Sequence, residues 1–279
     1  MERKLTLTNA QGKTIDLMSD ETLFTEVSDL GFSLKNEYKT VGSNFLLTDS
    51  EYNHTGIKGT MYFKGDNPYQ TYFDLVKDFS NQDLTLTYNT VKEFKLSCRM
   101  TATTKKEHTK DYRQAEITFM PNGLWYSEVS EICIPKTDVE NGKAYDYTYA
   151  YKYSPSNDGY IVIESDTNIP SPVRLIVFGQ SKNTSWTQYL NNNIVATGKM
   201  NWLTVQEDQR LVVDATNVNN AIEVQSMDGR KVVDAYRLSD FSTERFLYLR
   251  KGENKIVVNN DEGTETTFIV EARLNYESV

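Results

Sequence analysis

The stretch that decides the fold is Val173-Arg174-Leu175-Ile176-Val177-Phe178-Gly179, a short apolar run that ends at a glycine. Similar runs follow at 210–214, 246–249 and 252–258, and Asn, Gly, Asp or Ser residues separate each run from the next. Short apolar runs with turn residues between them are typical of the strands of a β-sandwich. The C-terminal half is therefore predicted to be a β-sandwich.

The composition favours a β-rich, acidic protein. A length of 279 residues allows one large or two ordinary domains, and 18 tyrosines and 12 phenylalanines favour half-buried pleated surfaces. The net charge of −9 disfavours general nucleic-acid binding, because affinity for phosphate comes from clustered Lys and Arg. The basic cluster Lys105, Lys106 and Lys110 is flanked by Glu107 and Asp111, so we interpret it as a solvated loop.

Cys98 and Cys133 are the only cysteines in the sequence. They are too few for a disulfide framework or a four-cysteine zinc site, and their apolar neighbours favour buried free thiols. The N-terminus lacks the apolar core of a signal peptide, and no window reaches the ~18 apolar residues of a membrane span. We therefore expect folding in a reducing cytoplasm, where the sequons at Asn53 and Asn183 carry no glycan.

The N-terminal domain is predicted over residues 1–135 and reads mainly as strands. Apolar residues at 5, 7, 15 and 17 bracket a turn and predict a hairpin. Further strands are predicted at 31–34, 61–63, 84–88, 93–103 and 116–120. The polar stretch 103–114 would be a long hairpin tip, which is either a mobile loop or an arm that grips a neighbour, and the pattern favours the loop.

One segment breaks the β pattern and predicts a helix. Asn67 is a suitable N-cap, Pro68 is a suitable first helical residue, and Asn81 ends the segment. The apolar stripe of this amphipathic helix is Tyr69, Tyr72, Phe73, Val76 and Phe79.

A connector is predicted from Ser127 to Gly142, and a second β domain over residues 145–279. Tyrosines alternate strictly at 145, 147, 149, 151 and 153, so all five would point to one face of a strand. We interpret this ladder as packing rather than as a ligand platform.

Candidates for catalysis or metal binding are weak. His54 and His108 are the only histidines, and no Gly-x-Ser-x-Gly elbow, two-histidine zinc motif or phosphate-binding glycine loop accompanies them. A glycosidase pair among the 39 acidic residues stays open, although surface charge is the simpler interpretation. Residues 259–263 contain calcium-loop residue types, but a hairpin turn between the runs 256–258 and 267–270 explains them. We therefore predict no catalytic, cofactor-binding or metal-binding residues, and no enzyme.

The order of several pieces resembles the distal tail protein (Dit) family of siphophages, the baseplate hub component of phage tails. The N-terminal pieces include Ile57-Lys58-Gly59-Thr60-Met61-Tyr62-Phe63 and Leu124-Trp125-Tyr126, and the C-terminal pieces are the apolar runs described above. The resemblance implies a mainly β fold. It comprises an N-terminal β-barrel- or sandwich-like ring domain with one α-helix, and a C-terminal galectin-like β-sandwich (jelly-roll) domain.

Galectin-like sandwiches can stack a sugar on an exposed tryptophan, which makes Trp186 and Trp202 candidates. Trp202 alternates with Thr204 beside Leu203 and Val205, as in an ordinary strand. Trp186 belongs to a piece that resembles a turn of the family, and neither histidine lies in this domain to complete a galectin sugar site. Packing is the preferred interpretation for both residues.

The resemblance implies a structural protein of the phage tail tip, or of a prophage-derived tail-like particle, produced in the bacterial cytoplasm. It implies a homohexameric ring, monomeric when dilute, that joins the tail tube protein to the tail-associated fibre protein and to receptor-binding proteins. We expect the ring in the N-terminal half, DNA passing through a neutral or acidic lumen without specific binding, and no membrane partner. The alternatives are a carbohydrate-binding adhesion module and, less favoured, a wall-degrading enzyme.

Overall fold

The computed structural model describes residues 4–31, 33–53, 55–106, 112–134, 159–216, 219–261 and 266–279. The chain forms two compact units, one of Met1–Ser127 with Tyr276–Val279 and the other of Glu128–Asn275. The predicted domain limits at 135 and 145 stay predictions. Both histidines, Lys110 and the tyrosine ladder at 145–153 lie outside the described residues.

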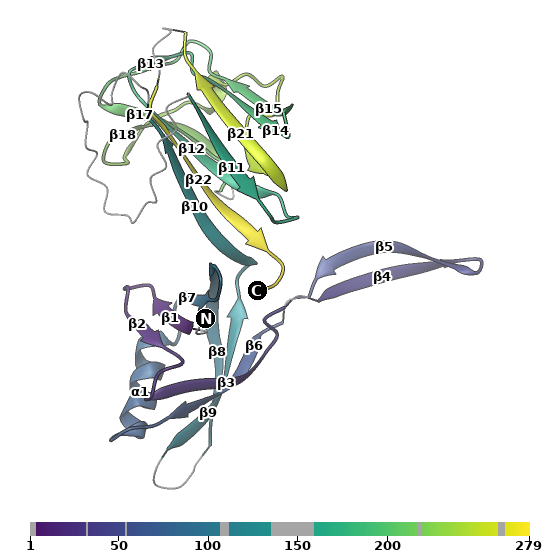
Figure 1. Cartoon of the computed structure of the whole chain (residues 1–279), viewed down its shortest axis with the longest axis vertical. Coiled ribbons are helices and arrows are strands. Elements are labelled where there is room, and N and C mark those ends of the chain that lie inside the picture. The colour runs from purple at the N-terminus through teal and green to yellow at the C-terminus, as the bar shows by residue number, and fades with distance from the viewer. Residues whose placement is uncertain are drawn as a thin grey trace. The chain divides into compact units, whose positions relative to one another are not determined.

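The N-terminal unit is built on one antiparallel sheet (Figure 1). Its strands are β1 (Lys4–Asn9), β2 (Thr14–Asp16), β3 (Thr22–Ser28), β6 (Ile57–Phe63), β7 (Leu84–Asn89), β8 (Glu93–Lys106) and β9 (Arg113–Pro121). The strand order is β2-β1-β7-β8-β9-β6-β3. An isolated bridge joins Met18 to Leu23 near the two ends of the sheet, but no ladder joins β2 to β3 among the described residues. Over these residues the sheet does not close into a barrel, because the three-residue β2 pairs with β1 and not with β3.

Most strands of this unit lie where the sequence predicts them. The first hairpin pairs Leu7 with Ile15, and the long strand β8 pairs with β9 over its outer half. The strand predicted at 31–34 is wrong for its first residues, since Gly31 and Ser33 precede a strand that begins at Leu34.

The helix α1 (Pro68–Phe79) begins as predicted, with the Asn67 side chain accepting a hydrogen bond from the Gln70 backbone N–H at 3.2 Å. Its buried residues are Leu75 and Phe79, whereas Tyr69 and Phe73 are 51% and 52% exposed. The predicted stripe therefore extended too far, to Tyr69 and Phe73, and it missed Leu75. The helix contacts β6 and β9 of the sheet.

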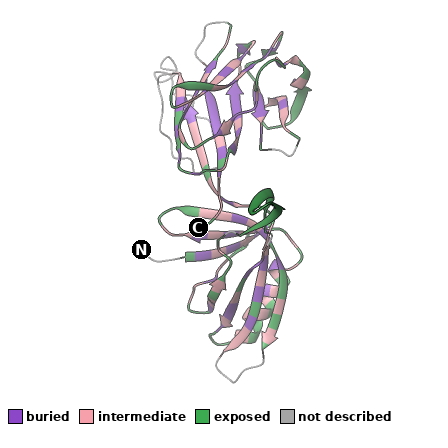
Figure 2. Ribbon diagram, turned by 90° about the vertical axis from the view of Figure 1, so that its right-hand side faces the viewer, coloured by how far each residue is buried: buried purple, intermediate pink, exposed green. Residues whose placement is uncertain are grey.

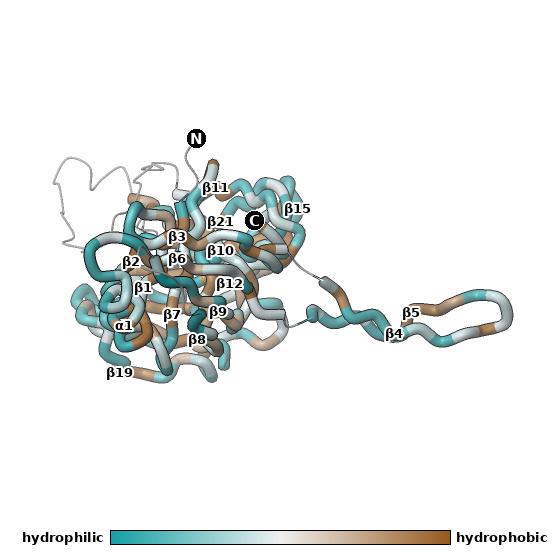
Figure 3. The backbone as a smooth tube through the Cα atoms, turned by 90° about the horizontal axis from the view of Figure 1, so that it is seen from below, coloured by the Kyte–Doolittle hydropathy of each residue, from teal (hydrophilic) through white to brown (hydrophobic). Residues whose placement is uncertain are grey.

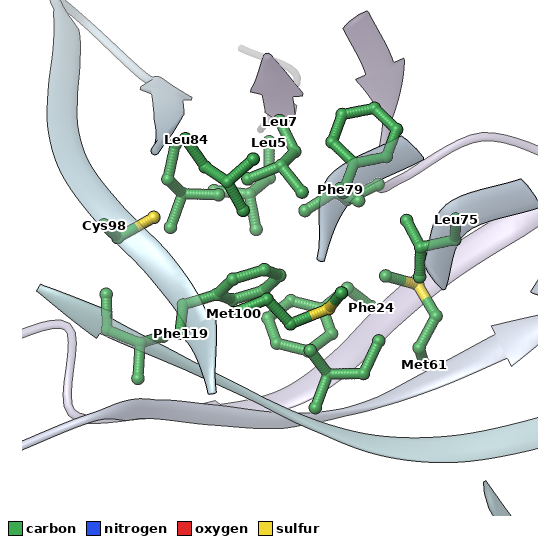
Figure 4. Packing of buried hydrophobic residues seen from close by; sticks show 14 of the residues in the cluster. Leu5, Leu7, Phe24, Met61, Leu75, Phe79, Leu84, Cys98, Met100 and Phe119 are labelled. Carbon is green, nitrogen blue, oxygen red and sulfur yellow. The ribbon is translucent and has the colours of Figure 1, made fainter. Parts of the chain in front are cut away.

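The core of the N-terminal unit lies between α1 and the sheet. Figure 4 shows Leu75 and Phe79 of α1 pointing into the same interior as Leu5, Leu84 and Met61 of the strands. Phe24 and Phe119 meet edge to face, with ring centroids 5.8 Å apart. Each fully buried side chain of this size stabilises the fold by roughly 1.5–3 kcal/mol, so this cluster holds the sheet and the helix together.

The C-terminal unit is a sandwich of two antiparallel sheets, which confirms the predicted β-sandwich. The first sheet has the order β19-β18-β17-β12-β22-β10 and the second has the order β11-β21-β14-β15. The first comprises β10 (Trp125–Cys133), β12 (Ser171–Phe178), β17 (Gln209–Asp214), β18 (Ala221–Ser226), β19 (Lys231–Asp234) and β22 (Phe268–Tyr276). The second comprises β11 (Tyr160–Ser165), β14 (Ser185–Leu190), β15 (Asn193–Lys199) and β21 (Gly252–Asn259). Shorter elements are β13 (Ser181–Lys182), β16 (Thr204–Val205), β20 (Tyr248–Leu249) and the 3-10 helix η2 (Tyr236–Leu238).

Two predictions about this unit are wrong. Residues 127–133, predicted as part of a connector, are the greater part of strand β10. The predicted hairpin turn after Val258 is a crossing, because β21 and β22 belong to different sheets. The local pattern indicated a connector at 127–133 and a turn after Val258. It did not show which sheet each strand joins, because strand pairing depends on residues distant in sequence.

We predict that Gly198→Ala destabilises the C-terminal unit by ~2 kcal/mol, because overpacking a tight core costs about 1–3 kcal/mol. Gly198 lies opposite Trp186, and a Cβ there would meet the fully buried indole at 2.2 Å. The measurement is chemical denaturation of the full chain. The neighbouring exposed Lys199→Ala is the control and should change stability by less than about 0.5 kcal/mol. Equal effects of the two substitutions would contradict the packing argument.

Candidate functional site

The most conspicuous surface of the N-terminal unit is a hairpin of β4 (Leu34–Val41) and β5 (Asn44–Tyr52), which we call the arm. The two strands pair with each other and with no other described strand. Every residue of both strands is exposed, as the green colouring of the hairpin in Figure 2 shows. The arm extends away from the sheet and helix of its own unit (Figure 1). The arm is therefore a surface that the described chain leaves uncovered.

The turn of the arm is a two-residue connection through Gly42 and Ser43, since Val41 pairs with Asn44. Gly42 has a φ of 62°, a left-handed conformation that glycine adopts without strain. Gly-Ser between two extended runs is a known hairpin signal. Sequence reasoning missed it because the charged residues of the flanking strands obscured the alternation.

The two faces of the arm differ in chemistry. Cross-strand pairs place Leu34 with Tyr52, Tyr38 with Leu47 and Thr40 with Phe45 on one face, together with Asn36 and Ser50. The opposite face pairs Lys35 with Glu51 and Glu37 with Asp49. Figure 3 shows the resulting mixture of hydrophobic and hydrophilic stretches along β4 and β5. An arm with one uncharged, partly aromatic face and one charged face is built to lie against another surface.

The tip of the arm is apolar on both faces. Phe45 lies on the uncharged face and is 76% exposed, while Val41 and Leu46 lie on the opposite face and are also exposed. Lys39 is the only charged residue between 38 and 48.

The base of the arm is held by two hydrogen bonds. The Asn53 backbone N–H donates to the Ser33 carbonyl oxygen at 2.8 Å, which closes the hairpin at its foot. The Tyr52 hydroxyl donates to Oε1 of Glu277 at 2.8 Å, and this bond to a carboxylate raises the pKa of Tyr52. The base is thereby tied to the last residues of the chain, where Tyr276 packs edge to face on Phe94 with ring centroids 5.1 Å apart.

A pocket of about 550 Å³ opens at the base of the arm. Its apolar wall includes Ile57, Leu96 and Trp125, which are themselves buried. Within the described part of the chain, its charged lining residues are Asp29 and Glu277, both acidic. Tyr52 and Asn53 also line the pocket, so the arm begins at its rim. The N-terminal unit thus carries an exposed apolar tip and an acidic-rimmed apolar pocket.

Residues 4–122 match the family model described as distal tail protein, N-terminal domain. This part of the chain therefore has the sequence pattern of the N-terminal domain of distal tail proteins. The resemblance found in the sequence is therefore confirmed for the unit that carries the arm.

Solved structures resemble the whole chain in fold. A chain in the phage p2 baseplate, in its activated conformation with Sr, has 18% identity and a TM-score of 0.60, and the match covers 100% of both chains. The Dit protein of phage SPP1 has 13% identity and a TM-score of 0.60, with 96% of this chain and 98% of that chain covered. A comparison with curated proteins found no match. The distal tail fold thus extends beyond the matched N-terminal domain.

The remaining predicted site residues are not brought together. In the distal tail domain, Lys106 forms an ion pair with Glu116 at 2.5 Å and Lys105 Nζ lies 4.7 Å from the ring centre of Tyr69, so the described part of the basic cluster contacts its own fold. No group of three or more His, Cys, Asp or Glu residues that could hold a metal ion occurs among the described residues. Over the same residues, no helix has the length and apolar character of a membrane span.

The two tryptophan candidates have opposite environments. Trp186 lies in β14, is fully buried and donates its indole N–H to the Arg245 carbonyl oxygen at 2.8 Å, so its role is packing. Trp202 does not lie in a strand as predicted. It occupies a loop with a φ of 61° and is 91% exposed. The alternation around Trp202 was misleading because only Thr204 and Val205 pair, and they pair with the short β13.

We predict that neither thiol of the folded protein reacts with a thiol reagent at pH 8. Both cysteines are buried and neither forms a disulfide, and burial raises the pKa of Cys98 to about 12. Since the thiolate is the reactive form, only about one Cys98 in ten thousand would be ionised at that pH. Titration with Ellman's reagent should find no reactive thiol in the native protein and both after denaturation. Rapid labelling of the native protein would contradict the described burial.

Proposed function

We propose that this protein is a distal tail protein that assembles into a ring at the phage tail tip and serves as the hub between the tail tube and the adsorption apparatus. Two observations support the proposal: the family of residues 4–122, and the arm on that same domain. The main support for the proposed self-assembly is the arm, because it is an exposed hairpin with an uncharged face.

An isolated two-stranded hairpin is at best marginally stable in water, so the arm needs a covering surface. If its partner is a second copy of the same chain, the contact is heterologous, and heterologous contacts close into rings when the rotation permits. We therefore assign the contact with a neighbouring copy to the arm at 34–52 and not to the hairpin tip at 103–114, which the sequence had offered as a possible arm. The described residues on either side of that tip continue the β8–β9 ladder.

The partners of the ring follow from the same proposal. The ring would contact the tail tube protein on one side and the tail-associated fibre protein on the other, and the C-terminal sandwich would carry or orient receptor-binding proteins. The ring number of six comes from the family resemblance. DNA would pass through a neutral or acidic lumen, which accords with the net charge of −9 for each chain.

We predict that removing the arm abolishes ring formation without unfolding the domain. Residues 34–52 would be replaced by a two-residue Gly-Ser turn, because Ser33 and Asn53 already meet through a backbone hydrogen bond. Rings counted by negative-stain electron microscopy over a range of protein concentrations should disappear, while thermal unfolding stays cooperative. The full-length chain is the control. Rings of normal frequency from the armless variant would refute the role given to the arm.

A second candidate function, carbohydrate binding, is favoured by one observation. Trp202 exposes nearly its whole indole in a loop of the C-terminal sandwich, where an aromatic face is available for stacking on a sugar ring. This candidate would make the C-terminal unit an adhesion module for the bacterial surface rather than a holder of other tail proteins.

If that candidate is correct, a glycan array of bacterial wall polysaccharides should show binding that Trp202→Ala reduces at least tenfold. A matched control is Phe241→Ala, which removes another exposed aromatic ring of the same unit. Binding that survives Trp202→Ala would show that Trp202 is not the stacking residue, whereas the absence of any binding would eliminate the carbohydrate function and leave the hub function as the sole proposal.

A further inference from the structure

We propose that the tip of the arm of one copy, residues 41–46, occupies the pocket at the base of the arm of the next copy. This inference rests on the proposed ring and specifies its contact. It makes each subunit both a donor, through its tip, and an acceptor, through its pocket.

The first argument is the distribution of apolar side chains along the arm. The inner part has one uncharged and one charged face, which suits a segment that lies on a surface. The tip has Phe45 on one face and Val41 and Leu46 on the other, so it is covered on both sides only if it enters a concave site. The pocket provides such a site, and the accessible apolar surface of its lining comes from Tyr52, Pro121 and Leu124, because Ile57, Leu96 and Trp125 are almost wholly buried.

The second argument is charge. Lys39 is the only charged residue between 38 and 48, and it follows the tip into any site that the tip enters. Among the residues that the structure describes, the charged ones that line the pocket are Asp29 and Glu277, both acidic. A single cation beside two anions is a complementary pairing that favours this register over a docking of tip against tip.

The third argument is length. The eight residues of β4 span ~26 Å at ~3.3 Å per residue, and the arm begins at the rim of its own pocket. A straight hairpin therefore holds its tip far from its own pocket, and the tip can fill only the pocket of another copy.

The same length sets the size of the ring. If each tip enters the next pocket, successive pockets are separated by about one arm length, ~26 Å. The side of a regular hexagon equals its radius, so six copies would place the pockets ~26 Å from the ring axis. The contact uses two different surfaces of the chain, and such a heterologous contact closes as a ring when the rotation between successive copies permits.

The test is directed cross-linking of the full chain. Ser43→Cys places a thiol in the turn of the tip, and Gly123→Cys places one in the pocket lining, where a Cβ meets no atom within 4 Å. The natural thiols of Cys98 and Cys133 are buried. With a short bismaleimide, the double variant should give a ladder of covalent oligomers that ends at the ring number. A mixture of the two single variants should give covalent dimers only.

The matched control is Ser43→Cys combined with Lys77→Cys, which places the second thiol on the exposed side of α1. A ladder from the pocket pair at least tenfold stronger than that from the control pair supports the inference. Rings with equal or no cross-linking from the pocket pair would overturn it and leave the hub function standing. A chain that neither forms rings nor cross-links at any concentration would overturn both.

A second measurement does not require introduced thiols. Phe45→Ala should raise the dissociation constant of self-association at least about 30-fold, as expected for an aromatic anchor that fills a pocket. Val91→Ala truncates another apolar residue, 83% exposed and outside both arm and pocket, and should leave the constant within about twofold. Equal changes of the dissociation constant for Phe45→Ala and Val91→Ala would overturn the proposal that the tip binds in the pocket.

Discussion

In a β-hairpin that is surrounded by water, each strand pairs only with the other and no further layer covers its faces. The arm of the N-terminal unit is such a hairpin. The arm keeps its ladder of backbone hydrogen bonds, but its uncharged face receives no cover from the described chain. An isolated two-stranded hairpin is at best marginally stable in water, which is the physical basis for our proposal that a second copy covers the arm. In the proposed ring, each of these features contributes to covering the arm: the apolar tip enters a pocket, and the hydrogen bonds at the base hold the hairpin on its domain.

The body of the unit can carry such an arm because its own core is complete. Aromatic and aliphatic side chains from α1 and the sheet are buried together, so the arm is not needed to finish the fold. The base is fixed by the Tyr52–Glu277 hydrogen bond, and Glu277 belongs to the last residues of the chain, which pack on this first unit.

The C-terminal unit differs from the arm, because its two sheets cover each other's apolar faces within one chain. Trp186 fills the interior opposite Gly198, and the close approach of the indole to that backbone requires the absence of a side chain there. The exposed Trp202 shows the contrast, because the same residue type in a loop contributes nothing to this core. The difference between the two tryptophans therefore lies in their burial: Trp186 packs in the core, whereas Trp202 is accessible to a ligand.

The sequence alone determined the local structure and the family. The alternation at 84–88, the N-cap and proline at 67–68, and the apolar runs after Val173 all specified their elements, because backbone propensity and side-chain periodicity act over a few residues. It did not determine which side chains would be covered. The helix stripe was drawn too wide at Tyr69 and Phe73, Trp202 was placed in a strand, and the chain after Val258 was given a hairpin where it crosses between sheets. The arm and its pocket emerged only from the tertiary structure, because exposure and the convergence of residues as distant as Asp29, Leu96 and Glu277 are properties of the assembled chain and leave no periodic trace in the sequence.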